Sequence, residues 1–262
     1  MVNLRDELKL LTATALFVLI GIVAQQVAIS ALWGTPGQTF TLFDLMSPIP
    51  VAFLGLVNGL AAILIAKLLP LLLQNQPIDP ITLVRLLPAV AGGLFFWAYR
   101  QKQTLPTLLQ YGLPILAIIL FWVHPAIWGT WAMLYPLYWL IPLLVLLSAG
   151  PLGSWLDKND SWLNNGHFKT VRRWGAWMGR ALGATFTQHA IGGVLWLYTI
   201  PASQNPAFWL ALIPLVAIER LVFSMGIATN SLGVEAVLQR MTLLYKAITR
   251  TPNAQPMPRK KK

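Results

Sequence analysis

Seven apolar blocks, each close to the length of a membrane span, do most to limit what this chain can fold into. A helix needs about 20 apolar residues to cross the ~30 Å hydrocarbon core of a bilayer, and 56% of the 262 residues are hydrophobic while only 10% are charged. The blocks lie near residues 10–33, 49–73, 81–99, 105–123, 126–149, 178–200 and 207–229. We therefore predict an all-α, polytopic transmembrane helix bundle in one domain over residues 1–250, with a disordered basic tail at 251–262.

The basic residues indicate how these blocks are oriented. Lys and Arg gather in three connections, at 100–102, within 158–173 and from Arg240 to the C-terminus, and two blocks separate each connection from the next. The positive-inside rule places all three in the cytoplasm. Because three blocks precede Arg100, a cytoplasmic N-terminus requires one block that does not cross. Block 105–123 and a broken helix within 49–99 are the candidates. We predict six spans, with seven as the alternative.

This orientation predicts the side on which each connection lies. Residues 150–177 form the only long polar connection and are expected to be a cytoplasmic loop, with a short surface helix within it as an alternative. Beyond Thr229 the spacing is amphipathic, and we expect that segment to lie along the inner membrane surface. The polar loop 34–47 falls outside, where it can cover a site, and Pro48 and Pro50 can serve as its hinges. Lys67, near the expected inner end of its helix, is expected to reach the headgroups.

Polar and ionisable residues at membrane depth are the first candidates for a binding site. Gln188 and His189 fall on one face of block 178–200, together with Thr185, Gly192 and Trp196, by their helical spacing. Glu219 and Arg220 lie in the middle of the last block, where a charge needs a partner. Since adjacent helical residues point about 100° apart, we expect Glu219 to pair with His189 rather than with Arg220. The alternative is that these groups only join helices by hydrogen bonds.

An aromatic stripe and a polar helix supply further candidates. Trp128, Trp131, Tyr135 and Trp139 recur at intervals of three and four residues, so Trp128, Trp131 and Tyr135 are candidates for stacking on a planar ligand. The alternative is an interfacial aromatic belt. Asn58 is a candidate polar anchor on the helix of block 49–73. Small residues four apart, such as Gly55 and Gly59, permit close helix contact.

Several function classes are excluded or disfavoured by what the sequence lacks. There are no cysteines and only three histidines, so we expect no metal site and no cofactor. No Walker phosphate loop, HExxH or GxSxG motif occurs, so we do not expect an enzyme. The net charge of +11 is accounted for by membrane orientation and lipid contact, and we expect no nucleic-acid partner.

Several short segments, taken in order, resemble the S components of energy-coupling factor (ECF) transporters. They are Ala24-Gln-Gln-Val-Ala28, Phe43-Asp44-Leu45, the run from Ile49 to Gly59, Ala66-Lys67-Leu68-Leu69 and the run from Ile213 to Leu221. The resemblance implies a substrate-capture subunit in a prokaryotic plasma membrane, usually of six helices, that works with a T subunit and two cytosolic ATPase subunits. It also implies that loop 34–47 is a lid over the ligand, and that Ala24 and Ala28 form a first-helix contact with the T subunit.

Three functional hypotheses follow. The first is an ECF-type substrate-binding component that captures a small micronutrient, with Asn58, Gln188, His189 and Glu219 as polar anchors. The second is a non-catalytic structural or assembly subunit of a larger membrane complex. The third is an enzyme acting on a lipid-linked substrate, with His189 and Glu219 as an acid/base pair.

Overall fold

A computed structural model describes residues 4–31, 39–75, 80–99, 104–148 and 166–249 of the chain. The described chain is mainly helical, as expected. Its helices are α1 (Leu4–Ala24), α2 (Ile49–Leu54), α3 (Leu56–Leu73), α4 (Pro80–Ala98), α5 (Thr104–Trp122), α6 (Ile141–Leu147), α8 (Gly166–Thr199) and α9 (Pro206–Thr249). Three short 3₁₀ helices, η1 (Leu42–Leu45), η2 (Trp131–Leu140) and η5 (Pro201–Gln204), and the strands β1 (Ala28–Ala31) and β2 (Thr39–Thr41) complete the described elements.

Three of the described helices are long and apolar enough to cross a membrane, over Glu7–Ala24, Leu56–Leu73 and Pro206–Met241. Large apolar side chains also face outward along the bundle, among them Leu11 on α1, Leu116 on α5 and Ile218 on α9. An apolar outer surface of this extent is costly in water but is what a bilayer requires. Both features favour a membrane protein.

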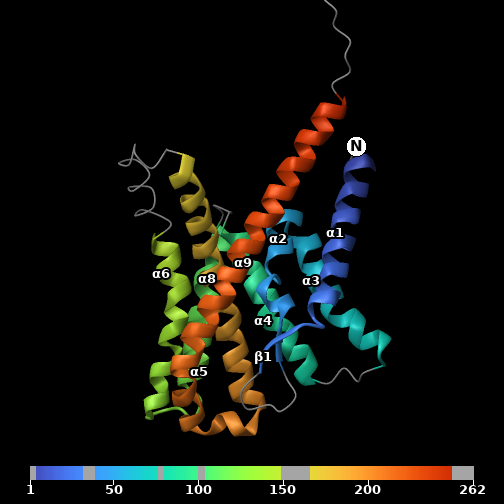
Figure 1. The fold of residues 1–262 in the computed structure, drawn as a ribbon. Helices are drawn as coiled ribbons and strands as arrows, with labels where there is room; N and C mark the ends of the chain where they lie inside the picture. Colours follow the sequence, from blue (N-terminus) through green and yellow to red (C-terminus); the bar gives the residue numbers. More distant parts are fainter. Residues whose placement is uncertain (1–3, 32–38, 76–79, 100–103, 149–165, 250–262) are drawn as a thin grey trace, which may run out of the picture.

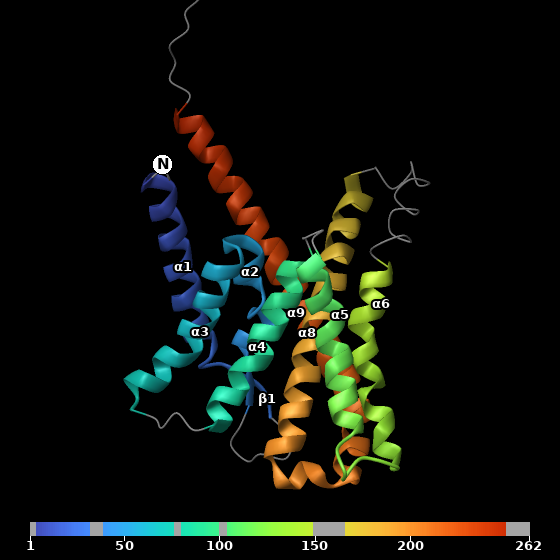
Figure 2. The same ribbon diagram turned by 180° about the vertical axis from the view of Figure 1, so that it is seen from behind.

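Helix α8 lies at the centre of the bundle and packs mainly against α4 and α9 (Figures 1 and 2). Small residues allow the close approach. A Cβ atom at Gly183 would collide with the ring of Phe95 on α4. The start of α1 and the end of α9 lie at one end of the molecule, and the β1–β2 hairpin lies toward the other (Figure 1). This arrangement agrees with termini on the same side of a membrane.

The block 49–73 is a helical hairpin rather than one helix. The chain reverses at Gly55, whose φ of 80° is in the left-handed region that glycine adopts readily. Helices α2 and α3 then pack side by side, and a Cβ atom at Gly59 would collide with the backbone of Val51. Gly59 therefore serves the contact with α2, whereas Gly55 makes the turn. A broken helix within residues 49–99 was one of the two candidates for the block that does not cross the membrane.

The first block is shorter than expected. Helix α1 ends at Ala24, and Ala28 begins strand β1, which pairs antiparallel with β2. The expectation that Ala24 and Ala28 form one face of the first helix is therefore wrong. Ala24 is buried within the chain beside Phe43, so it is not available to a partner subunit. Residues Ala28–Ala31 do not continue the helix because their backbone pairs with β2 in the hairpin.

Two expectations about the cytoplasmic side are also wrong. Residues 166–177, expected to lie in a loop or a short surface helix, form the first turns of the long helix α8. The segment beyond Thr229 does not turn along the membrane surface but continues α9, whose 44 residues extend about 66 Å, well beyond a bilayer core of ~30 Å. Contacts between the two helices support the extension, because Arg173 Nη2 lies 2.8 Å from Glu235 Oε1. The predicted loop residues 150–165 and the tail 251–262 lie outside the described residues.

The aromatic stripe is split by the geometry of η2. A 3₁₀ helix has three residues per turn instead of 3.6, so Trp131 lines up with exposed Leu134 and Leu137, not with buried Tyr135. Trp128 and Trp131 are 66% and 76% exposed, respectively. The expected four-residue stripe is therefore wrong, and only its second half faces the interior.

Candidate functional site

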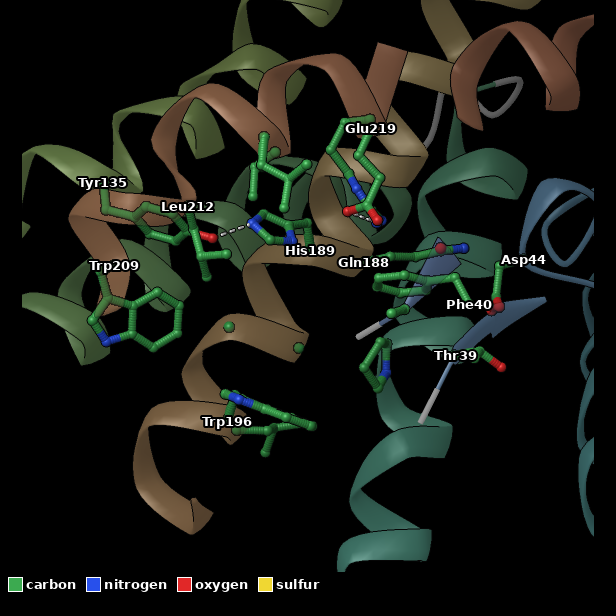
Figure 3. Close-up of a pocket in the computed structure, with 18 of the residues that line it drawn as sticks. Thr39, Phe40, Asp44, Tyr135, Gln188, His189, Trp196, Trp209, Leu212 and Glu219 are labelled. Atoms are coloured by element: carbon green, nitrogen blue, oxygen red, sulfur yellow. Dashed lines mark hydrogen bonds and ion pairs between the residues drawn. The ribbon is translucent and has the colours of Figure 1, made fainter. Parts of the chain in front are cut away.

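A cavity of about 230 Å³ lies between the β1–β2 hairpin and the helices α4, α8 and α9 (Figure 3). The hairpin and η1 form one wall, with Thr39, Phe40 and Asp44 labelled in the close-up. Helices α8 and α9, with Tyr135 from η2, form the facing wall. The residues of that wall are Tyr135, Gln188, His189, Gly192, Gly193, Leu195, Trp196, Phe208, Trp209, Leu212, Leu215, Val216, Glu219 and Arg220.

Spacing along α8 brings several of the wall residues together. Gln188, His189, Gly192 and Trp196 lie on one helical face, as predicted, and all four line the cavity. Thr185, expected on that face, is fully buried and does not line it. A Cβ atom at Gly192 would be 3.5 Å from Cγ of Pro88, an ordinary contact distance, so the position accepts a methyl group without a collision. The face therefore offers polar atoms, a glycine without a side chain and an indole ring in succession.

His189 is held by Tyr135 rather than by Glu219. The Tyr135 hydroxyl lies 2.8 Å from Nε2 of His189, and the tautomer of the ring decides which group donates. Tyr135 is fully buried and packs against Phe121 and Trp209. The expected contact between Glu219 and His189 is thus replaced by one to an aromatic hydroxyl, which fixes the imidazole ring at the cavity wall.

Glu219 forms its ion pair with Arg220, the neighbour that was expected to point away. Arg220 Nη2 donates to Glu219 Oε2 at 2.8 Å. The Cα–Cβ bonds of Glu219 and Arg220 point in different directions, but the long arginine side chain can fold back toward Glu219. The Arg220 guanidinium lies 4.8 Å from the ring centre of Phe40 and 4.4 Å from that of Phe223. These two rings hold the guanidinium where Glu219 can accept its hydrogen bond.

The same pair connects the hairpin to α9. Ser30 Oγ on β1 donates to Glu219 Oε1 at 3.1 Å, and Phe40 on β2 covers Arg220. Phe40 also meets Phe223 edge to face, with ring centres 5.3 Å apart. Three side-chain contacts therefore hold the hairpin over the top of the cavity.

A second ion pair lies on the other side of the cavity. Lys67 Nζ on α3 is 3.8 Å from Asp44 Oδ1 on η1, and both residues line the cavity. The backbone N–H of Thr41 donates to Asp44 Oδ2 at 2.7 Å, which fixes the carboxylate. The expectation that Lys67 reaches the headgroups on the inner side is wrong. Because the chain reverses at Gly55, the end of α3 that carries Lys67 lies at the hairpin side.

The same reversal removes Asn58 from the site. Asn58 lies near the start of α3, about 13 Å along the helix from Lys67, is half-buried and does not line the cavity. Trp128 and Trp131 do not line it either. Tyr135, Gln188, His189 and Glu219 are the predicted site residues that the structure brings together.

Sequence reasoning did not single out Trp209 and Leu212, nor did it single out Thr39 and Phe40, although both of these lie in loop 34–47, which was expected to cover a site. The sequence around Trp209 and Leu212 is apolar and carries no polar signal. Trp209 is oriented locally, since its Nε1 donates to the carbonyl of Ser203 at 2.6 Å. Asp44 and Lys67 are the exceptions. Two opposite charges in otherwise apolar surroundings could have indicated a pair.

The cavity combines apolar walls with polar side chains that are held in place by the protein. Gln188 Nε2 donates to Ser47 Oγ at 3.1 Å, so Gln188, like His189 and Glu219, is oriented by a contact within the protein. Within the described residues, no group of three or more His, Cys, Asp or Glu side chains converges on a point that could hold a metal ion. The apolar walls and oriented polar groups are typical of small-molecule sites.

Comparison of the chain with protein-family models, with curated proteins and with solved structures finds no match.

Proposed function

We propose that the chain is the membrane-embedded substrate-binding subunit of an ECF-type transporter, and that it captures a small nutrient for uptake driven by partner ATPases. One observation carries the proposal: a cavity with oriented polar groups lies between a helix bundle of apolar exterior and a short β-hairpin. A bundle that only scaffolds other subunits has no need of such a cavity. The similarity of the short sequence segments to ECF S components gives the transporter class.

The hairpin is suited to cover and release a ligand. Its side-chain contacts with α9 are the Ser30–Glu219 hydrogen bond and the packing of Phe40 on Arg220 and Phe223. Contacts of this kind are individually weak, at about 1 kcal/mol each. Opening the hairpin therefore breaks only a few side-chain contacts and leaves the packing between the helices intact.

The orientation follows from the same arrangement. With both termini in the cytoplasm, the hairpin end of the cavity opens toward the outside, where a nutrient must be captured. The extension of α9 then enters the cytoplasm, on the side where ATPase partners act. The protein's own part in this proposal is binding and release, since His189 and Glu219 contact Tyr135 and Arg220 and do not form the pair that an acid/base mechanism requires.

The partner side of the proposal is tested by affinity purification of the tagged full chain from native membranes in mild detergent. We expect a second membrane subunit and ATP-hydrolysing subunits to co-purify. Recovery of a different membrane complex without any ATPase, under conditions that preserve a control ATPase complex, would refute the transporter assignment and favour an assembly subunit.

The ligand side is tested by mass spectrometry of small molecules released from the purified protein. We expect one compound to be retained by the wild type and lost from Gly192→Leu, which adds a bulky side chain at the cavity wall. Gly233→Leu is the matched control, because a Cβ atom at Gly233 on α9 meets nothing within 4 Å. Retention of the compound by Gly192→Leu would show that it binds elsewhere.

A further inference from the structure

We infer that the cavity takes an uncharged molecule with a flat aromatic ring, in preference to an anion or a cation of the same shape. This inference deepens the proposed function, since it names the ligand class of the same cavity. It depends on the charges, the ring surfaces and the free space of the lining residues.

The charges that line the cavity cancel within the protein. Two carboxylates, Asp44 and Glu219, and two bases, Lys67 and Arg220, are present. Each acid has its own base, at 3.8 Å for Lys67–Asp44 and 2.8 Å for Arg220–Glu219. A ligand with a net charge would leave one charge unbalanced among apolar walls, which is strongly unfavourable.

Arg220 is not arranged to receive an anion. Its side chain is only 3% exposed, aromatic rings lie against the guanidinium, and Nη2 is bonded to Glu219. Its Nε is buried without a partner among the described residues, so that atom is closed to ligand as well. The two-pronged contact by which arginine usually binds carboxylate or phosphate is therefore unavailable.

Glu219 is equally unsuited to receive a cation. Oε1 accepts from Ser30 and Oε2 accepts from Arg220. An ammonium group on the ligand would have to displace the hairpin contact or separate the ion pair. Asp44 is likewise occupied, by the backbone N–H of Thr41 and by Lys67.

The other lining residues offer an aromatic surface for a flat ring and one polar group that can hydrogen-bond to it. Trp196 is half-buried, lines the cavity and makes no ring-to-ring contact with any other described residue. It lies on the same side of the cavity as His189 and Trp209 (Figure 3). Gly192, between His189 and Trp196 on the same helical face, also lines the cavity and places no side chain beside the indole. An indole ring that lines the cavity suits a planar, uncharged ring.

His189 supplies the hydrogen bond to such a ring. Tyr135 occupies Nε2, and in the described part of the chain Nδ1 has no protein partner. The free nitrogen donates or accepts according to the tautomer, so it suits a ligand hydroxyl group, which can do either. A neutral aromatic alcohol has this combination of a flat ring and a hydroxyl.

Three probes with one ring system and different charges test the inference: indole-3-ethanol, which is neutral, indole-3-acetate, which is an anion, and tryptamine, which is a cation. Binding is measured by equilibrium dialysis of the full-length protein, with mass-spectrometric quantification of each probe. We expect indole-3-ethanol to bind roughly tenfold or more tightly than either charged probe. Tighter binding of a charged probe, or no binding of any of the three, would overturn the inference.

Charge variants sharpen the test. Glu219→Gln leaves Arg220 without its counter-charge and should shift the preference toward indole-3-acetate, whereas Lys67→Gln leaves Asp44 unbalanced and should shift it toward tryptamine. Arg240→Gln, at an exposed position of α9 outside the cavity, is the matched control and should leave the order unchanged. If one variant does not fold, as judged by size-exclusion chromatography, the other still tests the predicted shift in preference.

An unchanged order of binding in a folded charge variant would overturn the inference even if the wild type prefers the neutral probe. Failure here is distinguishable from failure of the proposed function. Co-purifying ATPase subunits with the wrong probe order would refute only the ligand class. The expected probe order without any ATPase partner would refute only the transporter assignment.

Discussion

Two adjacent glycines in α8 should respond in opposite ways to the same substitution. A Cβ atom at Gly192 would lie 3.5 Å and 3.8 Å from two atoms of Pro88, which are ordinary contact distances. A Cβ atom at Gly193 would lie 2.7 Å from Cζ2 and 3.2 Å from Cη2 of Trp139. Trp139 is fully buried, so its ring has little room to move. We therefore predict that Gly192→Ala folds normally and that Gly193→Ala is destabilised.

The magnitude follows from two terms. Replacing a glycine within a helix by alanine stabilises the helix by roughly 0.5–1 kcal/mol, and this gain is common to both variants. Overpacking against a rigid core side chain costs about 1–3 kcal/mol and applies only to Gly193→Ala. The free energies of unfolding of the two variants should therefore differ by about 1–3 kcal/mol, with Gly192→Ala the more stable.

The assay is unfolding by SDS in mixed micelles, followed by tryptophan fluorescence, for wild type and variants. Gly233→Ala is the control for helix propensity alone, because its Cβ atom meets nothing within 4 Å. Gly192→Ala should match Gly233→Ala in stability but bind the cavity's ligand more weakly, since the added methyl group enters the cavity. Equal stability of Gly192→Ala and Gly193→Ala would refute the assignment of close packing at Trp139.

Three further predictions concern packing and hydrogen bonds. Tyr135→Phe removes the buried hydroxyl contact to the imidazole and should lower the free energy of unfolding by about 1–3 kcal/mol; a loss below measurement error would mean that the hydrogen bond is not formed. Gly183→Ala should collide with Phe95 and lower the melting temperature, and Phe95→Leu in the same chain should restore part of the loss; a fully stable single variant would contradict the close contact of α4 and α8. A double-mutant cycle on Arg173→Gln and Glu235→Gln should give a coupling of at most about 1 kcal/mol, because both side chains are partly exposed; a coupling several times larger would show that the pair is shielded from solvent.

Helical spacing was enough to bring the residues of one face of the site together. Gln188, His189, Gly192 and Trp196 share a face by the 3.6-residue period alone, and the structure places all of them at the cavity. The same reasoning failed for Trp131 and Tyr135, because η2 winds with three residues per turn. Nothing in the local sequence distinguishes the two periods there.

The sequence by itself determined the helical class, the apolar blocks and the side chains that need partners at membrane depth, since composition and periodicity are local properties. Only the tertiary structure decided which partners meet. Glu219 is joined to Ser30 across 189 residues, and Lys67 comes to Asp44 because the chain reverses at Gly55. That reversal depends on the fit of Gly59 against the backbone of Val51. Such a fit arises between elements once they pack, so the spacing of glycines along one helix could not show it.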